Sequence, residues 1–388
     1  MENRFEKNKL LGRIALGLIA LAIIEALAFG VIKGQSYIQK YKSYKSTIEF
    51  LKQQGVEEPG VFLDEVVELF YSKGGPRFHP YRWFYLKPSH VGKYHSTDKY
   101  GFRNKIDAEN SEKAVIAFYG GSTMYSTVTM EKDSLPRLIA PYLDANKIRP
   151  VNFGMGWYDS SAEMMTFIET TRVNKNIKYA VFLDGVNDVA RYIERLQSGN
   201  DEPIYDIWGF PLKTQGLCLG LSHTYKAGWG MCDDGGSFPY SWSMLQKYAG
   251  ITKKENDKIN YDEAAGTIAS IYINNMETVR HLAVQAGVKP IFLLQPQIFS
   301  KKKRTPAEEN IRMAMLNKEV DVERLYKESY SKIISLANER KLPFYDVSGA
   351  FDDLDENGIH FNDFCHVDAV GNKALAKAIA DVLRHEVE

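Results

Sequence analysis

The sequence predicts an α/β protein, built as a three-layer α/β/α sandwich around a central parallel sheet of about five strands. From residue 114 to the C-terminus, short apolar runs alternate with longer helical patterns. That alternation is typical of a parallel sheet covered by helices on both faces. Glycine-containing and polar motifs follow several of the apolar runs directly, and the carboxyl ends of parallel strands are where such sheets place their sites.

The elements follow from the period of the apolar residues. Strands are expected at Ala114–Tyr119, Pro150–Phe153, Tyr179–Leu183, Pro290–Leu294 and Pro343–Val347. Helices are expected at Ser134–Asn146, Ala162–Val173, Asp188–Gln197, Asp262–Ala286, Ala307–Arg340 (with a break) and Val370–Val387.

An apolar segment near the N-terminus predicts a transmembrane signal-anchor helix within residues 1–34. Ile14 to Ile32 is apolar apart from Glu25, and basic residues precede it. At about 1.5 Å per residue, such a helix nearly spans a hydrocarbon core of roughly 30 Å. A cleaved signal peptide is the alternative, because Ala26-Leu27-Ala28 resembles a cleavage site; a buried helix is the third. An anchor implies a periplasmic or cell-surface domain, and cleavage implies secretion.

Two further regions of the chain are expected after the apolar segment. Residues 35–110 are a stalk and an irregular lead-in, rich in Pro, Gly and aromatic residues towards its end. Residues 111–388 form the main domain, with an insertion at about 199–260 that interrupts the strand–helix rhythm and is expected to act as a functional cap. Within the insertion, Cys218 and Cys232 form a disulfide if the protein is exported, or remain two free thiols.

The amino-acid composition limits the classes of partner and of protein that the chain can represent. Lys+Arg and Asp+Glu both number 49 in the 388 residues, so no basic excess indicates binding to nucleic acid. A mean hydropathy of -0.33 describes a soluble body with one apolar segment rather than a polytopic membrane protein. The sequence makes no prediction of the oligomeric state.

Ser122 is the candidate nucleophile. It follows an expected strand and two glycines, which let the chain turn sharply, and the segment after it can present amide N–H groups. By itself Gly-Gly-Ser is also a common turn. A serine hydroxyl is a weak nucleophile at neutral pH and needs a base.

Asp363 and His366 supply that base. A spacing of three puts both side chains on one face of a turn, so that the carboxylate holds one imidazole nitrogen while the other faces the site. Asn187 and the backbone amides of Ser122 and Gly156 are the candidate oxyanion donors. Simple helix capping also fits Asn187, and a plain turn also fits Gly156.

These motifs together resemble the SGNH (GDSL-like) hydrolase superfamily, in its membrane-anchored bacterial type. The blocks are Gly120-Gly121-Ser122-Thr123, Asn152-Phe153-Gly154-Met155-Gly156, Gly185-Val186-Asn187-Asp188 and Asp363-Phe364-Cys365-His366, with a lead-in at Tyr100–Asn104. The resemblance implies a flavodoxin-like fold and a serine esterase. The second block departs from the family pattern Asn-x-Gly-x-x-Gly, because Trp157 occupies its last position. Either the loop is one residue shorter, or Trp157 donates its own amide.

The function that the resemblance implies is removal of an acyl group, often O-acetyl in this family, from a cell-envelope carbohydrate or related ester. No cofactor and no metal are expected. Three alternatives remain open: an O-acyltransferase using the same site on a glycan, a lipid esterase, and a non-catalytic envelope or assembly protein that retains the fold.

Three other features are assigned weaker roles. Asp353 to Gly358 resembles the start of a calcium loop, but Phe364 stands where the bidentate Glu is required. Cys365 is expected to pack rather than to act as a nucleophile. The basic run Lys301 to Arg304 is expected to be solvated, with anionic lipid headgroups or an anionic polymer as the alternative partner.

Overall fold

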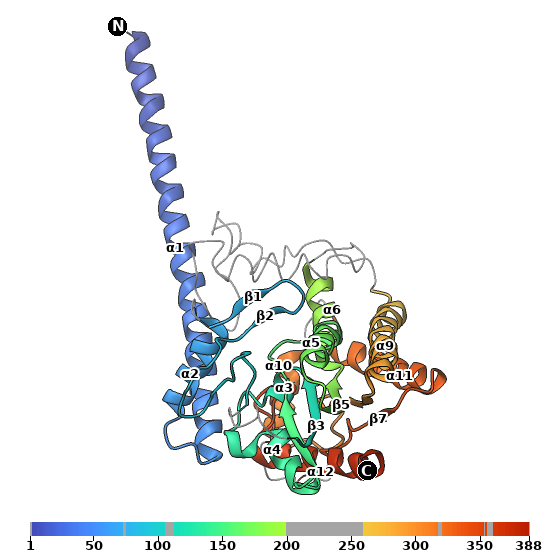
Figure 1. Ribbon diagram of the computed structural model, residues 1–388. Helices are drawn as coiled ribbons and strands as arrows, with labels where there is room; N and C mark the ends of the chain where they lie inside the picture. The colour runs from blue at the N-terminus through green and yellow to red at the C-terminus, as the bar shows by residue number, and fades with distance from the viewer. Residues whose placement is uncertain are drawn as a thin grey trace.

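The computed structural model describes residues 2–72, 75–104, 112–198, 259–316, 320–352, 354 and 360–387 (Figure 1). The insertion at 199–260, including Cys218 and Cys232, lies outside these residues except at its end. So does nearly all of the calcium-like segment at 353–358.

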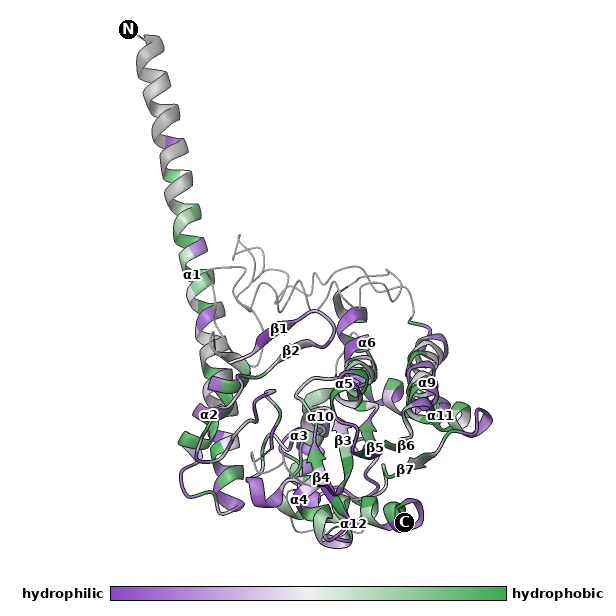
Figure 2. Ribbon diagram, in the orientation of Figure 1, coloured by the Kyte–Doolittle hydropathy of each residue, from purple (hydrophilic) through white to green (hydrophobic). Residues whose placement is uncertain are grey.

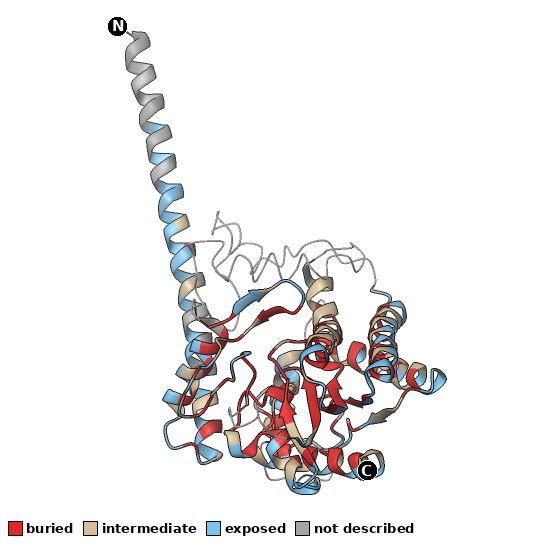
Figure 3. Ribbon diagram, in the orientation of Figure 1, coloured by how far each residue is buried: buried red, intermediate tan, exposed pale blue. Residues whose placement is uncertain are grey.

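A five-stranded parallel sheet forms the centre of the protein, in the order β4-β3-β5-β6-β7. The strands are β3 (Ala114–Gly120), β4 (Ile148–Asn152), β5 (Ile177–Asp184), β6 (Lys289–Leu294) and β7 (Phe344–Asp346). Most of their residues are buried, as the red strands in Figure 3 show. Burial on both faces explains why the strands read as continuous apolar runs rather than alternating ones.

Helices cover the two faces of the sheet. One layer contains α5 (Ser160–Val173), α9 (Tyr261–Ala286) and α11 (Val322–Glu339), in which α9 packs against both α5 and α11. In the same layer, α6 (Val186–Ser198) packs against α9 and α11. On the other face, α4 (Leu135–Ile139) packs against α12 (Ala369–Glu386). Right-handed crossovers give this division, because the chain moves from β3 to β4 in one direction and from β4 through β7 in the other. The predicted α/β class and five-stranded parallel sheet are confirmed.

The chain leaves β3 towards one edge of the sheet and leaves β5 towards the other, so the order of connections reverses between these two neighbouring strands. The candidate site residues follow the carboxyl ends of these two strands. In an open parallel sheet, such a switch point leaves a crevice where ligands bind. Ser122 follows β3, and Asn187 follows β5.

One predicted helix is shorter in the structure than the sequence pattern indicated. The expected continuous helix at 134–146 is instead α4, a 3-10 turn at Ala140–Tyr142 and a loop. Pro136 stands in the first turn, where it is tolerated, but Pro141 cannot continue the α-helical hydrogen bonding. The long helix expected at 307–340 is broken, into α10 (Pro306–Met315) and α11.

The lead-in is more regular than expected. It contains α2 (Pro59–Tyr71) and a hairpin of β1 (Arg77–His79) with β2 (Trp83–Tyr85). Its end is fixed by the buried guanidinium of Arg103, which donates to the carbonyls of Tyr94, Tyr125, Ser126 and Thr129. Arg103 therefore ties the lead-in to the segment that follows Ser122.

α1 (Glu2–Gln53) is continuous and projects from the body at its N-terminal end (Figure 1). It covers both the predicted membrane segment and the stalk. Its last turns pack on the body through the buried Phe50 and Leu51, whereas Leu16 and Leu27 are 68% and 66% exposed. Apolar residues also colour part of the projecting helix green in Figure 2.

The predicted transmembrane helix is not confirmed. Within the part of the chain that the structure describes, no helix is long and apolar enough to cross a membrane. Several side chains between Ile14 and Ile32 lie outside that part.

Candidate active site

Ser122 opens the short helix α3 (Ser122–Tyr125) directly after β3 and the turn at Gly120 and Gly121. A side chain at position 121 is excluded by its neighbour, because a Cβ there would overlap Nδ2 of Asn187. Glycine at this position therefore lets the backbone before Ser122 lie directly against the Asn187 amide.

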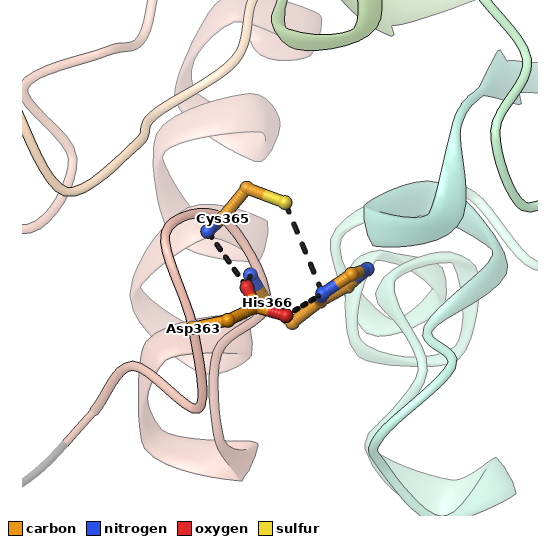
Figure 4. A group of neighbouring side chains, drawn as sticks. All are labelled: Asp363, Cys365 and His366. Atoms are coloured by element: carbon orange, nitrogen blue, oxygen red, sulfur yellow. Dashed lines mark hydrogen bonds and ion pairs between the residues drawn. The ribbon is translucent and has the colours of Figure 1, made fainter. Parts of the chain in front are cut away.

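His366 joins Ser122 to Asp363. Its Nε2 lies 2.6 Å from Oγ of Ser122, and its Nδ1 lies 2.6 Å from Oδ2 of Asp363. The second carboxylate oxygen, Oδ1, accepts the backbone N–H groups of Cys365 and His366 at 2.9 Å each. The tight turn thus fixes both the carboxylate and the ring, and Figure 4 shows Asp363 facing His366.

The electrostatics of the pair favour a charged imidazole. Burial by itself would lower the pKa of His366, but the Asp363 carboxylate, with Cys365, raises that pKa well above its ordinary value. Burial would likewise raise the pKa of Asp363, but the facing His366 outweighs it and leaves the carboxyl pKa below its ordinary value. An arrangement of this kind can stabilise an imidazolium at His366.

Asn187 lies at the start of α6, after Gly185, whose φ of 96° is a conformation that favours glycine. Its Nδ2 donates to the carbonyl of Tyr158 at 2.7 Å. An amide nitrogen carries two hydrogens, so this bond orients the side chain and leaves the second N–H for another acceptor. Gly121 beside Nδ2 places that donor next to Ser122.

The second block is held against the first. The Asn152 side chain donates to the carbonyl of Met124 at 3.1 Å, and the amide of Met155 donates to the carbonyl of Gly120 at 2.9 Å. Gly156 is buried, with Phe70 against its α-carbon. Trp157 has a left-handed φ of 63°, so the position where the family pattern has its last glycine keeps a backbone that favours glycine. Among the described residues, no hydrogen bond joins Gly156 to Ser122 or Asn187.

A short chain of hydrogen bonds connects the serine block to the histidine block. Gln295, buried directly after β6, donates from Nε2 to Oγ1 of Thr123 at 2.7 Å. Thr123 in turn donates to the carbonyl of Cys365 at 3.4 Å. These bonds hold the residue before His366 against the residue after Ser122.

Four carboxyl groups are buried close to the start of α6: Asp159, Glu163, Asp184 and Asp188. Tyr272 donates its hydroxyl to Asp184, and Ser160 donates to Asp188. Arg191 lies 3.3 Å from Asp159, and the carboxyl group of Glu163 faces that of Asp184.

Burial raises the pKa values of all four groups, and neighbouring carboxylates add to the shift at Glu163 and Asp188. The pKa of Asp184 rises to about 6. Charges this close together cannot all be ionised in a buried place, so part of the cluster holds protons near neutral pH. Asp184 and Asp188 flank Asn187 in the sequence, so the cluster lies beside that turn.

Sequence reasoning missed Gln54, the residue directly after α1. Its Nε2 donates to the carbonyl of Val128 at 3.2 Å, and its Oε1 accepts the amide of Ala369 at 3.1 Å. It therefore connects the loop that follows Ser122 with the first residue of α12, shortly after His366. No local pattern marks such a residue, because its partners lie far away in the sequence.

Comparisons with known proteins give a fold-level likeness only. No family model matches the chain, and no curated protein matches it. A member of the lipolytic G-D-S-L family from Veillonella parvula is 9% identical, with a TM-score of 0.38, over 70% of this chain and 98% of that one. A carbohydrate acetylesterase from Sinorhizobium meliloti is 14% identical, with a TM-score of 0.37, over 71% of this chain and 100% of the other.

A GDSL-like lipase from Bacteroides thetaiotaomicron is 13% identical, with a TM-score of 0.36, over 73% of this chain and 93% of that one. TM-scores this low carry no assignment of activity.

Proposed function

We propose that this protein is a serine esterase of the SGNH type that forms an acyl-enzyme at Ser122. The observation that carries the proposal is the continuous contact from Ser122 Oγ through both nitrogens of His366 to Asp363, with 2.6 Å at each step. This is the order of groups that converts a weak hydroxyl nucleophile into a reactive one.

The proposed reaction begins with the hydroxyl of Ser122. His366 takes its proton at Nε2 while Oγ attacks the ester carbonyl, and Asp363 stabilises the resulting imidazolium. The tetrahedral intermediate then collapses, and the leaving alcohol takes the proton from Nε2. Water, activated by the same nitrogen, next attacks the acyl-enzyme and releases the acid.

Three donors are proposed for the oxyanion: the amides of Ser122 and Gly156 and the second N–H of Asn187. The orientation of Asn187 by the Tyr158 carbonyl and its position beside Gly121 support its part in this set. Donors held in place before the reaction are worth roughly 3–4 kcal/mol each in transition-state stabilisation.

The substrate proposed is an O-acyl ester, most specifically an O-acetyl group on a carbohydrate. Support for the carbohydrate comes from the sequence resemblance. The test is incubation of the full chain with O-acetylated polysaccharides and with long-chain acyl esters, measuring acetate or fatty acid release against Ser122→Ala. Acetate released from polysaccharide by the wild type alone agrees with the proposal, and preference for long chains contradicts it.

Hydrolysis and transfer are separated in the same assay. The acyl-enzyme reacts with whichever hydroxyl reaches it first, so an acceptor glycan is added with an acetyl donor ester. Acetate in solution indicates the proposed hydrolase, whereas acetyl groups on the acceptor would assign the protein as an O-acyltransferase.

The location proposed is outside the cytoplasm, with the domain tethered through residues 14–32. The apolar sequence of that segment and its exposed leucines support this proposal. Membrane fractionation with alkaline extraction, combined with protease accessibility of the intact cell or spheroplast, tests it. Recovery of the full-length chain in the cytosolic fraction would overturn it.

A further inference from the structure

We propose that Asp363, Cys365 and His366 form a binding site for a thiophilic divalent cation such as Zn²⁺, and that its occupation switches the esterase off. The inhibitory part rests on the proposed function, whereas the binding part does not. The site uses the atoms that orient the catalytic ring, so a bound cation and an active base exclude each other.

The three potential ligand atoms face one another. One ligand atom from each of the three residues lies within 4.8 Å of the other two, which makes this a candidate metal group among the described residues. Sγ of Cys365 lies 3.8 Å from Nδ1 of His366, and Oδ2 of Asp363 lies 2.6 Å from the same nitrogen. Figure 4 shows the thiol and the carboxylate approaching Nδ1 from different sides.

These separations are close to those of tetrahedral zinc. With Zn–S near 2.3 Å and Zn–N near 2.0 Å, a tetrahedral ion separates sulfur from nitrogen by about 3.5 Å and nitrogen from oxygen by about 3.3 Å. The Cys365–His366 distance already fits. The Asp363 oxygen must retreat by roughly 0.7 Å, and water completes the coordination.

The ligand chemistry selects the cation. A thiolate and an imidazole nitrogen favour zinc, cadmium and other soft ions, whereas magnesium and calcium prefer oxygen ligands alone. The Asp363 side chain is 26% exposed and that of His366 is 11% exposed, so a cation can reach the carboxylate edge. Cys365 is buried, and burial raises the pKa of its thiol.

Binding requires a rearrangement of protons. The thiol of Cys365 loses its proton to solvent, and the proton on Nδ1 of His366 moves to Nε2 while the cation takes Nδ1. Cation binding therefore releases protons, because Sγ and Nδ1 must both be unprotonated to act as ligands. Nε2 then carries a hydrogen towards Ser122 and cannot accept the proton of its hydroxyl, so acylation stops.

The experiment uses the full chain with Cys218→Ser and Cys232→Ser, which leaves Cys365 as its only thiol. Cd²⁺ is titrated while the ultraviolet charge-transfer absorption of cadmium–thiolate bonds is followed, and Zn²⁺ inhibition of ester hydrolysis is measured in parallel. Cys365→Ala serves as the matched variant, because the hydrogen bond from Thr123 goes to the backbone carbonyl at position 365, which alanine retains.

We expect the charge-transfer band in the protein that retains Cys365 and its loss in Cys365→Ala. Zn²⁺ should inhibit the wild type at least tenfold more strongly than Cys365→Ala, with each protein measured against its own metal-free rate, and a chelator should restore the wild type. No band with Cys365 as the only thiol, or equal inhibition of both proteins, would overturn the proposal. A band in a protein without esterase activity would uphold the site and reject the proposed function.

Discussion

Nδ2 of Asn187 lies so close to the α-carbon of Gly121 that a methyl group at position 121 would overlap it. The turn before the nucleophile and the proposed oxyanion donor are therefore fitted to each other. Their contact brings the side chain of Asn187 against the backbone directly before Ser122.

Gly121→Ala is expected to lower kcat by about 10²–10³, comparable to the loss of one oxyanion donor, because the methyl group displaces Asn187. Circular dichroism and kcat on an acetyl ester check this. Gly266→Ala is the control: it lies within α9 with open space around it, and should raise the free energy of unfolding by about 0.5–1 kcal/mol without affecting kcat. Full activity of a folded Gly121→Ala would reject the fitted arrangement.

The pairing of Asp363 with His366 predicts a pH profile. Protonated His366 cannot act as a base, so kcat/KM falls as the pH drops through the pKa of His366. That pKa is raised well above its ordinary value, because the pairing outweighs the burial that lowers it. The acidic limb of the profile should therefore lie above pH 6.5, the ordinary value for histidine.

Asp363→Asn removes the charge that raises the pKa, so the acidic limb should move to lower pH while the maximal rate falls by about 10⁴. A pH–rate series on both proteins measures the two effects. A limb that stays in place in the variant would show that Asp363 does not set the pKa of His366.

The buried carboxyl cluster predicts a loss of stability with rising pH. The pKa of Glu163 is raised in the folded protein by burial and then by the neighbouring Asp184, so the folded state retains a proton that the unfolded chain has released. Stability is full below the unfolded pKa and falls as pH rises through the window towards the folded pKa. Each such group contributes a slope of about 1.4 kcal/mol per pH unit within that window.

Glu163→Gln removes one of these groups, and should reduce the decline in unfolding free energy above about pH 4.3, the ordinary pKa of glutamate. Urea denaturation from pH 4 to 8 measures it. Glu339→Gln, on the exposed end of α11, should leave the slope unchanged. Identical slopes in wild type and Glu163→Gln would mean that the carboxyl is not held protonated.

Gln54 predicts a link between α1 and the catalytic loops. Gln54→Ala loses its hydrogen bonds to Val128 and Ala369, and should lower the free energy of unfolding by about 1–3 kcal/mol and reduce kcat. Thermal unfolding and esterase kinetics test it. Gln53→Ala, its exposed neighbour, should behave as wild type, and equal effects of the two substitutions would contradict the link.

The sheet could be predicted from sequence because its strands are buried on both faces and read as uninterrupted apolar runs. The predicted ends of the strands then indicated where the site motifs come together, since the carboxyl ends of parallel strands lie at one edge of the sheet. The prediction of a helix at 134–146 was wrong because it followed the apolar pattern and gave too little weight to Pro141, which ends the α-helical hydrogen bonding. The prediction missed α2 because the surrounding Pro, Gly and aromatic residues are typical of an irregular segment.

The candidate triad was within reach because Asp363 and His366 are three residues apart and Ser122 follows a strand. The rest of the site depends on contacts between distant segments. Glu163 in α5 interacts with Asp184 at the end of β5, and Gln295 donates a hydrogen bond to Thr123, which is far from it in the sequence. No local period encodes such pairs, so only the folded chain reveals them.

The central claim is that His366 activates Ser122, and labelling with a fluorophosphonate followed by mass spectrometry tests it most directly. The full chain should be labelled at Ser122, with labelling abolished in Ser122→Ala and strongly slowed in His366→Ala, while both variants remain folded by circular dichroism. No labelling of the folded wild-type protein, or labelling that is unaffected by His366→Ala, would contradict the account.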